Sequence, residues 1–416
     1  MKIKQLVSVL LLCLLWVSPA MAFDFNELFG SDLLFEVAEE EERPSLAETM
    51  LINEGVKVGG KYNLSVSSDW NFKDDKYSNR FRTNLSGNLF LDARPDPNYR
   101  VFANVQVNYG QGIYLSELFS DFNYQDKIFF RGGKQTINWG VGYFFSPADV
   151  INVGKIDPQN PEEPVEEPVE EPVEGPIALK INMPVDIHNY YLYLLFNDVE
   201  EINQIAIAPK VEFVVGRSEV GLGGYYQKEQ APRLMATISS SIKGVSLFGE
   251  AMISNGSDKR FLEKEQLFFK GTVGARFSRT DPQGLFSVAA AAQYYYNGEY
   301  LRDQSLLSNP VVVDLSLSTE DPRYDDLIDT GRHYFAATAS WNKLLNTDYT
   351  LSGFWLGNLS DNSGKASATL SFSGFEELVP SIGISKTYGE PGSEFVRFTE
   401  AATTIFFNVS LGSGSF

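Results

Sequence analysis

The sequence predicts an all-β chain that folds as a transmembrane antiparallel β-barrel of about 18 strands. Three observations support this: a secretory leader, many short segments in which apolar and polar residues alternate, and no later apolar run long enough for a spanning helix. Successive side chains of a strand point to opposite faces, so alternation gives each strand one apolar and one polar face. In an exported chain this pattern indicates a barrel with lipid outside and water inside.

Residues 1–22 have the layout of a cleaved signal peptide, with two lysines, a short apolar run and an Ala-Met-Ala cleavage site. The apolar run is too short to span a bilayer, so we expect cleavage before Phe23 rather than a membrane anchor. Residues 23–54 are then a periplasmic N-terminal segment, and residues 55–416 form the barrel. Cys13 is the only cysteine, so the mature chain has no disulfide and no thiolate ligand.

The composition is typical of a barrel rather than of a nucleic-acid-binding protein. The chain contains 31 Phe and 20 Tyr, which suit the aromatic girdles at the two membrane interfaces. Its mean hydropathy is −0.16, because polar residues of the lumen offset those that face lipid. The formal net charge of −20 argues against nucleic acid as a partner.

Strand-like segments follow one another along the whole predicted barrel. They cover about residues 56–68, 79–92, 99–110, 113–125, 127–138, 176–184, 189–197, 204–216, 218–228, 231–243, 244–254, 266–278, 284–297, 331–343, 347–359, 363–374, 378–389 and 399–411. Most have about the 9–11 residues that a tilted membrane strand needs. Boundaries read from sequence are uncertain by about 2–4 residues, which also allows sixteen strands.

The first three strands indicate which face lines the lumen. In the third, apolar residues from Val101 to Tyr109 alternate with Arg100, Asn104 and Gln106. Arginine on the lipid face at the bilayer midplane costs about 2–4 kcal/mol, so the arginines belong on the water-filled side. The predicted pore-lining residues are Lys57, Lys61, Arg80, Arg82, Arg100, Asn104 and Gln106. Their five cations come from three neighbouring strands and are expected to form one basic patch.

The connections between strands alternate between short and long. Those that follow even-numbered strands are mostly short and predicted to be periplasmic, whereas most of the long ones follow odd-numbered strands and are predicted to face outward. At sixteen to eighteen strands the interior is too wide for side chains to fill, so an aqueous channel is expected.

Residues 131–152 resemble a signature of porin-like outer-membrane families. Its elements are Gly133-Lys134-Gln135, Trp139-Gly140, Pro147, Asp149 and Asn152. The resemblance covers about 20 residues and implies that a strand ends here and that a loop folds into the barrel. It concerns the class of protein and not the solute. A purely structural interpretation is that Gly140 permits a sharp turn and Trp139 anchors it.

The loop at 156–176 contains an acidic repeat, in which Glu-Glu-Pro-Val occurs three times between residues 162 and 174. Proline at every fourth position excludes a helix interior and ladder pairing, so extended backbone is expected. Two interpretations remain open: a solvated outer loop, or an acidic loop across the pore mouth. The candidate inward-loop residues are Trp139, Asp149, Asn152, Glu162, Glu166 and Glu170.

The C-terminus resembles the assembly signal of outer-membrane barrels. Phe416 is terminal, and Phe407, Val409 and Leu411 precede it in alternation. This resemblance implies the barrel assembly machinery as a partner. The Gly-Ser run at 412–415 is expected to interrupt the last strand, so that Phe416 falls out of phase unless a bulge intervenes.

We therefore expect an outer-membrane channel of a diderm, Gram-negative-type bacterium, for passive or substrate-preferring diffusion of small hydrophilic solutes. No nucleophile lies beside a base in the sequence, and the two histidines are predicted at opposite ends of the barrel, so no catalytic residue, metal or cofactor is assigned. The alternatives are a barrel enzyme of the lipase or protease type and a structural or adhesive surface barrel with a blocked lumen. The expected partners are outer-membrane lipid and small solutes, and a homotrimer is one oligomeric state that the sequence allows.

Overall fold

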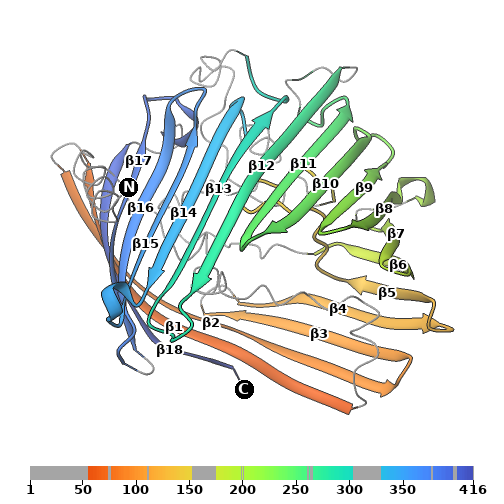
Figure 1. Cartoon of the computed structure of the whole chain (residues 1–416), viewed down its shortest axis with the longest axis horizontal. Helices are drawn as coiled ribbons and strands as arrows, with labels where there is room; N and C mark the ends of the chain where they lie inside the picture. The colour runs from red at the N-terminus through yellow and green to blue at the C-terminus, as the bar shows by residue number, and fades with distance from the viewer. Residues whose placement is uncertain are drawn as a thin grey trace.

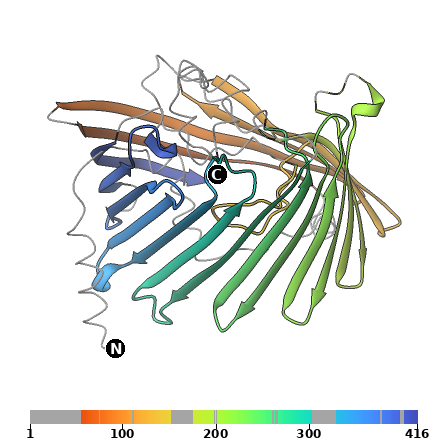
Figure 2. The same ribbon diagram turned by 90° about the horizontal axis from the view of Figure 1, so that it is seen from above.

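The computed structural model is an 18-stranded antiparallel sheet closed into a barrel (Figures 1 and 2). Each strand pairs with its neighbours in the sequence, and β1 pairs with β18. The structure describes residues 55–73, 76–109, 112–151, 175–197, 199, 201–259, 262, 266–302, 329–375, 378–396 and 401–415. The predicted signal peptide, the segment 23–54, most of the acidic loop and Phe416 lie outside these residues.

The predicted count of 18 strands is confirmed, and most strand boundaries agree within a few residues. The strands are β1 (Gly55–Lys73), β2 (Lys76–Asp96), β3 (Tyr99–Asn108), β4 (Gly112–Tyr124), β5 (Ile128–Lys134), β6 (Ile177–Val185), β7 (His188–Leu195), β8 (Ala206–Val215), β9 (Ser218–Tyr225), β10 (Arg233–Ile242), β11 (Val245–Asn255), β12 (Leu267–Thr280), β13 (Ser287–Asn297), β14 (His333–Asn342), β15 (Tyr349–Asn358), β16 (Ser363–Phe372), β17 (Val379–Tyr388) and β18 (Ala402–Ser415). Three short 3₁₀ turns are η2 (Ile202–Gln204), η5 (Leu344–Asn346) and η6 (Glu394–Val396).

The barrel closes between its first and last strands. The predicted interruption at 412–415 is wrong, because β18 continues to Ser415. A register shift between Asn63 and Ser65 of β1 takes up the extra residue of β18, as a bulge does. Every strand is therefore paired on both sides, which lipid requires because it cannot satisfy an open edge.

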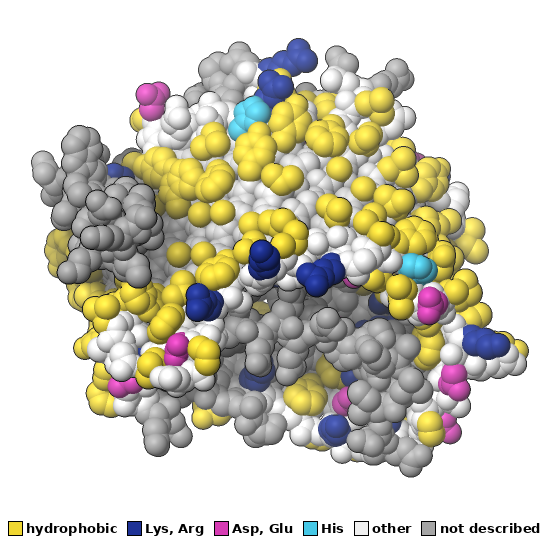
Figure 3. Space-filling model, in the orientation of Figure 1, with side chains coloured by type: hydrophobic (Ala, Val, Ile, Leu, Met, Phe, Trp, Pro, Cys, Tyr) yellow, Lys and Arg dark blue, Asp and Glu magenta, His cyan; other side chains and the backbone are white. Residues whose placement is uncertain are grey.

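The outer surface carries a band of exposed apolar side chains (Figure 3). Val58 is 62% exposed, Phe81 70% and Val273 62%, although each lies within a paired strand. The alternation in the sequence does not show which alanines of β13 face inward. In the structure Ala291 is 5% exposed and faces inward, on the same side as Gln293. No helix in the described residues is long and apolar enough to cross a membrane.

The two ends of the barrel differ, as predicted. Even-numbered strands end in connections of a few residues, and we call this end the short-turn rim; odd-numbered strands end at what we call the long-loop rim. His188 begins β7 at the short-turn rim, and His333 begins β14 at the long-loop rim. The prediction that the long-loop rim faces outward remains a prediction.

Val105→Arg is expected to impair assembly, whereas Asn104→Arg is expected to be tolerated. Val105 is paired with Leu89 and Leu115 on the outer face, where arginine near the midplane costs about 2–4 kcal/mol. Asn104 points inward and accepts a hydrogen bond from Asn88. The yield of heat-modifiable, folded barrel in cell envelopes checks this prediction. Equal yields of the two variants would mean that the assigned faces of β3 are wrong.

Candidate functional site

The seven predicted pore-lining residues share one face of β1–β3. Asn88 Nδ2 lies 3.2 Å from Asn104 Oδ1, and Arg82 Nη2 lies 2.6 Å from Asp69 Oδ2. Strand register places Lys61 and Gln106 on either side of Asn88, while Lys57 and Arg80 follow the same alternation. The face opposite to them carries the exposed apolar side chains, so this polar face is the inner one.

The predicted basic patch is not uniformly basic, because aspartates of the same face interleave with it. Arg82 pairs with Asp69 as above, and Arg100 Nε lies 2.8 Å from Asp92 Oδ1. Cations on a partly buried wall require counter-charges and hydrogen bonds, since their desolvation is otherwise unfavourable. Asp69 and Asp92 occupy the same alternating positions as the cations of their strands. The sequence alone therefore indicates that they share the inner face.

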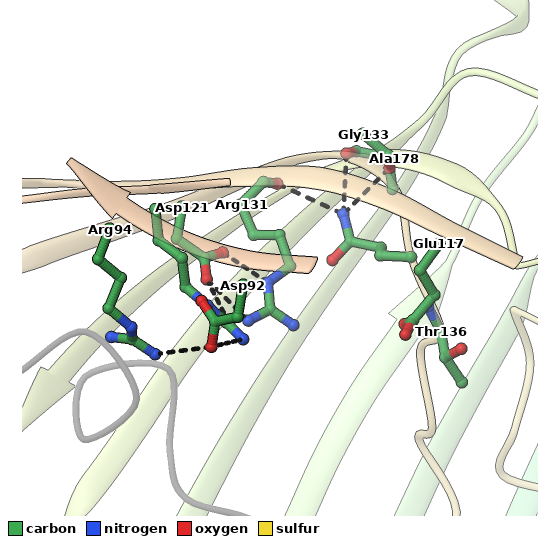
Figure 4. A network of polar contacts seen from close by, with 10 residues as sticks. Asp92, Arg94, Glu117, Asp121, Arg131, Gly133, Thr136 and Ala178 are labelled. Atoms are coloured by element: carbon green, nitrogen blue, oxygen red, sulfur yellow. Dashed lines mark hydrogen bonds and ion pairs between the residues drawn. The ribbon is translucent and has the colours of Figure 1, made fainter. Parts of the chain in front are cut away.

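Asp121 on β4 is the centre of this ion-pair chain (Figure 4). Its side chain has no exposed surface, and it accepts from Arg100 Nη1 at 3.0 Å and from Arg131 Nε at 2.6 Å. Asp92 joins the chain through Arg100 and lies 3.5 Å from Arg94. Four neighbouring strands, β2 to β5, are thereby connected by charged side chains along the inner wall.

The inner-wall cations continue beyond the strands that the sequence singled out. Lys180 on β6 lies opposite Arg131, and Lys210 on β8 lies further along the wall. Lys210 Nζ is 2.7 Å from Glu212 Oε1, so its charge is balanced. Within the described residues Lys180 forms no ion pair; its Nζ lies 4.9 Å from the ring centroid of Tyr191. Both positions lie beyond the first three strands, which carry all of the predicted pore-lining residues.

The chain leaves β5 where the signature begins. Gly133 has a φ of +135°, and a Cβ there would collide with the backbone of Leu118 and Phe119. Gln135 is 1% exposed, and its Nε2 donates to the carbonyl of Ala178 at 2.9 Å. Gly133 and Gln135 therefore end the strand, and β5 stops at Lys134 rather than at the predicted residue 138.

Trp139 anchors the loop on the inner wall. It is 1% exposed and meets Tyr193 edge to face, with ring centroids 5.3 Å apart. Its carbonyl accepts from Lys210 Nζ at 3.2 Å. Ile137, Ala148 and Val150 pack in the same apolar cluster, so the loop has a small core of its own against the wall.

One carboxylate organises the turn that follows. Glu250 on β11 accepts hydrogen bonds from the backbone N–H groups of Val141, Gly142 at 2.5 Å and Ala148 at 2.8 Å, and from Ser146 Oγ at 3.1 Å. A Cβ at Gly140 would overlap Ser146 and approach Glu250. Glycine in the Trp-Gly pair is thus required by the closeness of Ser146 first and of this carboxylate second.

A second wall residue, Gln293 on β13, holds the next three peptides. Its Oε1 accepts from the N–H groups of Tyr143 and Phe144 at 3.0 and 2.7 Å, and of Phe145 at 3.4 Å, while its Nε2 donates back to the Phe145 carbonyl at 2.5 Å. Phe145 stacks on Tyr295 with centroids 4.9 Å apart. Residues 135–151 therefore cross the inside of the barrel from β5 to β13.

The structure describes only part of the predicted inward loop. Trp139 and Asp149 lie within it, and the Asp149 N–H donates to the Ser146 carbonyl at 2.9 Å. Asn152, Glu162, Glu166 and Glu170 lie outside the described residues. Glu250 and Gln293, which hold the loop, were not among the residues predicted from the sequence. Glu250 stands alone as an acid among the apolar and small residues of β11, and that contrast could have drawn attention to it.

A second polar network ties the loops together at the long-loop rim. Glu394 of η6 accepts from Tyr334 Oη and Asn358 Nδ2, both at 2.6 Å, so the β17–β18 loop is fixed to β14 and β15.

Glu299, in the loop that follows β13, forms an ion pair with Lys270 on β12. Burial alone would raise the pKa of the Glu299 carboxyl, but Lys270 Nζ, 2.7 Å away, brings that pKa below its usual range. In the described residues no group of three or more His, Cys, Asp or Glu is placed to hold a metal ion.

No protein-family model matches the sequence, and neither does any curated protein. Among solved structures, the chain is similar to Pseudomonas aeruginosa OpdL, with 8% identity and a TM-score of 0.48 over 86% of this chain and 99% of that one. It is also similar to OccK2 (OpdF) of the same organism, in complex with glucuronate, at 9% identity and a TM-score of 0.48 over 86% and 98% of the chains. OccK9 (OpdG) of P. aeruginosa gives 9% identity and a TM-score of 0.49 over 87% and 98%.

Proposed function

We propose that this chain is an outer-membrane channel for small hydrophilic solutes. The observation that carries the proposal is a closed barrel with an apolar outside, a polar inside and a loop held across its interior by Glu250 and Gln293. A barrel this wide cannot be filled by its own wall side chains, so the inward loop is what narrows the passage. The solute passes between this loop and the charged wall of β1–β5.

We further propose that the channel prefers small anionic or dipolar solutes. Arg82, Arg100 and Arg131 are partly balanced by aspartates, whereas Lys180 forms no close ion pair in the described residues, and Glu212 and Asp121 act on it over longer distances. A cation that lacks a close ion pair on a low-dielectric wall attracts counter-ions and anionic groups. The same wall still offers carboxylates to the positive end of a dipolar solute.

Conductance across planar bilayers tests the channel. The purified protein is expected to give discrete steps in KCl, whereas a structural or adhesive barrel with a blocked lumen would give none. The absence of steps from correctly folded protein would therefore overturn the proposal.

Lys180→Gln is expected to shift the reversal potential in a KCl gradient toward cation preference. Because neighbouring cations of the wall, such as Arg100, Arg131 and Lys210, are paired with carboxylates, removal of this one should change the permeability ratio of chloride to potassium by about twofold. Lys386→Gln is the matched control, since Lys386 follows the outward-facing alternation of β17. The same shift in both variants would mean that Lys180 is not a lumen charge that the solute experiences.

A further inference from the structure

Four basic side chains lie along the short-turn rim between β8 and β15. Arg217 is in the β8–β9 turn, Lys243 in the β10–β11 turn, Arg279 near the end of β12, and Lys343 just after β14. All four are exposed. Figure 3 shows Lys and Arg side chains spaced along the lower edge of the apolar band. We call these four residues the basic rim.

Each cation of the basic rim has an exposed apolar neighbour. The neighbours are Val215 (66% exposed), Ile242 (50%), Phe277 (37%) and Leu345 (76%). Leu345 lies at the tip of its turn, and the other three are at or near strand ends. A cation beside an apolar side chain at the edge of an apolar band is suited to the boundary between lipid headgroups and acyl chains.

Two residues of the basic rim, Lys243 and Lys343, have a backbone conformation that is unfavourable for lysine. Lys243 has a φ of +52° and is followed by Gly244 at +81°, and Lys343 also has a φ of +52°. The two-residue hairpin at Lys243-Gly244 favours Asn-Gly, and the Lys343 position before η5 likewise favours asparagine, because other residues with a Cβ cost more free energy in the left-handed region. The lysines are therefore not explained by the turns they occupy, which points to a role for their side chains.

Among the residues that the structure describes, no acidic side chain forms an ion pair with the basic rim. Asp281 lies in the β12–β13 turn, where its Oδ2 accepts from the Gln283 N–H at 2.9 Å and the Leu285 N–H at 3.4 Å. Lys343 Nζ donates to the Gly284 carbonyl at 2.9 Å, which connects two neighbouring turns and leaves the ammonium charge unpaired. Asp348 is the other acid in these turns, so cations outnumber acids there.

We propose that the basic rim binds the phosphate groups of an anionic phospholipid, of the phosphatidylglycerol type, in the leaflet around the short turns. The row of cations matches anionic headgroups in charge, and the exposed apolar neighbours contact the acyl chains below them. The basic side chains sit on turns two strands apart, so one row contacts several headgroups. The inference rests on the membrane placement of the barrel and not on conduction.

Native mass spectrometry of the full-length mature protein tests this inference. The protein in neutral detergent is offered dioleoyl-phosphatidylglycerol, dioleoyl-phosphatidylcholine or lipopolysaccharide. Lys243→Asn/Lys343→Asn is the test variant, because asparagine suits both backbone positions and folding should not suffer. Lys228→Asn/Arg332→Asn makes the same change of charge at the long-loop rim and is the control. Conductance is recorded for all three proteins.

The wild type is expected to retain about threefold more phosphatidylglycerol than phosphatidylcholine. The test variant should lose most of this preference while the control keeps it, and conductance should persist in all three. Three results would each overturn the proposal. The wild type could retain the two phospholipids equally, it could bind lipopolysaccharide more strongly at the basic rim, or the test variant could keep the wild-type preference. If the wild type gave no conductance, the proposed channel function would be wrong, but the proposed lipid binding would not be affected.

Discussion

Replacing Glu250 with alanine is expected to release the inward loop and to widen the conducting passage. The carboxylate accepts from the N–H groups of Val141, Gly142 and Ala148. Hydrogen bonds to a charged group contribute about 1.5–3 kcal/mol each, so the substitution removes several kcal/mol that hold these peptides. Single-channel conductance in KCl should rise by about twofold, and the current should become noisier as the loop moves.

Two further variants distinguish the loss of these hydrogen bonds from the loss of a charge in the lumen. Glu219→Ala removes a carboxylate from the inner face of β9, two strands away from β11, and should leave the conductance near that of the wild type. Glu250→Gln keeps the shape but supplies a weaker acceptor, so its conductance should fall between the other two. If Glu219→Ala and Glu250→Ala changed the conductance equally, the carboxylate would act through the field in the lumen rather than through the loop.

The barrel could be predicted almost in full because its signal is local. In β3, alternation assigns Val105 to the outside and Asn104 to the inside without any knowledge of the partner strands. The last strand shows the limit of such reasoning. Whether β18 continues past Leu411 depends on a bulge paired with Asn63 and Ser65, more than 300 residues earlier in the chain. A local sequence pattern cannot predict a contact between residues so far apart in the chain.

The site could be predicted only in part for the same reason. The signature marked the place where β5 ends and a loop begins, and Trp139 lies on the inner wall as part of that loop. The residues that fix the loop, Glu250 and Gln293, are about 100 and 150 residues away from it. Their role follows from which strands face the loop across the lumen, and that is known only once the barrel is closed.

The charged wall illustrates a third kind of limit. The cost of placing arginine in lipid predicts that Arg82 and Arg100 face the lumen, but it does not predict which groups balance their charge. Desolvation on a packed wall makes a counter-charge necessary, and Asp69 and Asp92 supply it from positions of the same alternation. Counting cations and acids together along each face would have predicted the ion pairs.

Asp121→Asn is expected to give the largest loss of barrel stability among single changes to this wall. The aspartate is fully buried, and it holds both Arg100 and Arg131. Arg100 keeps Asp92, but Arg131 loses the carboxylate with which it pairs. Removing one partner of a buried ion pair costs about 3–5 kcal/mol, because it leaves an uncompensated charge. The temperature at which the folded band disappears on semi-native gels should fall clearly.

The variant should also become more anion-selective, since the arginines are then less balanced. Asp121→Asn/Arg131→Gln removes the uncompensated cation and should recover much of the lost stability, as coupling in a double-mutant cycle requires. Asp348→Asn, at an exposed position in a short turn, is the control that should leave both stability and selectivity unchanged. If the double variant lost stability by the sum of the two single changes, Asp121 and Arg131 would not be coupled, and the ion-pair chain would not stabilise the wall.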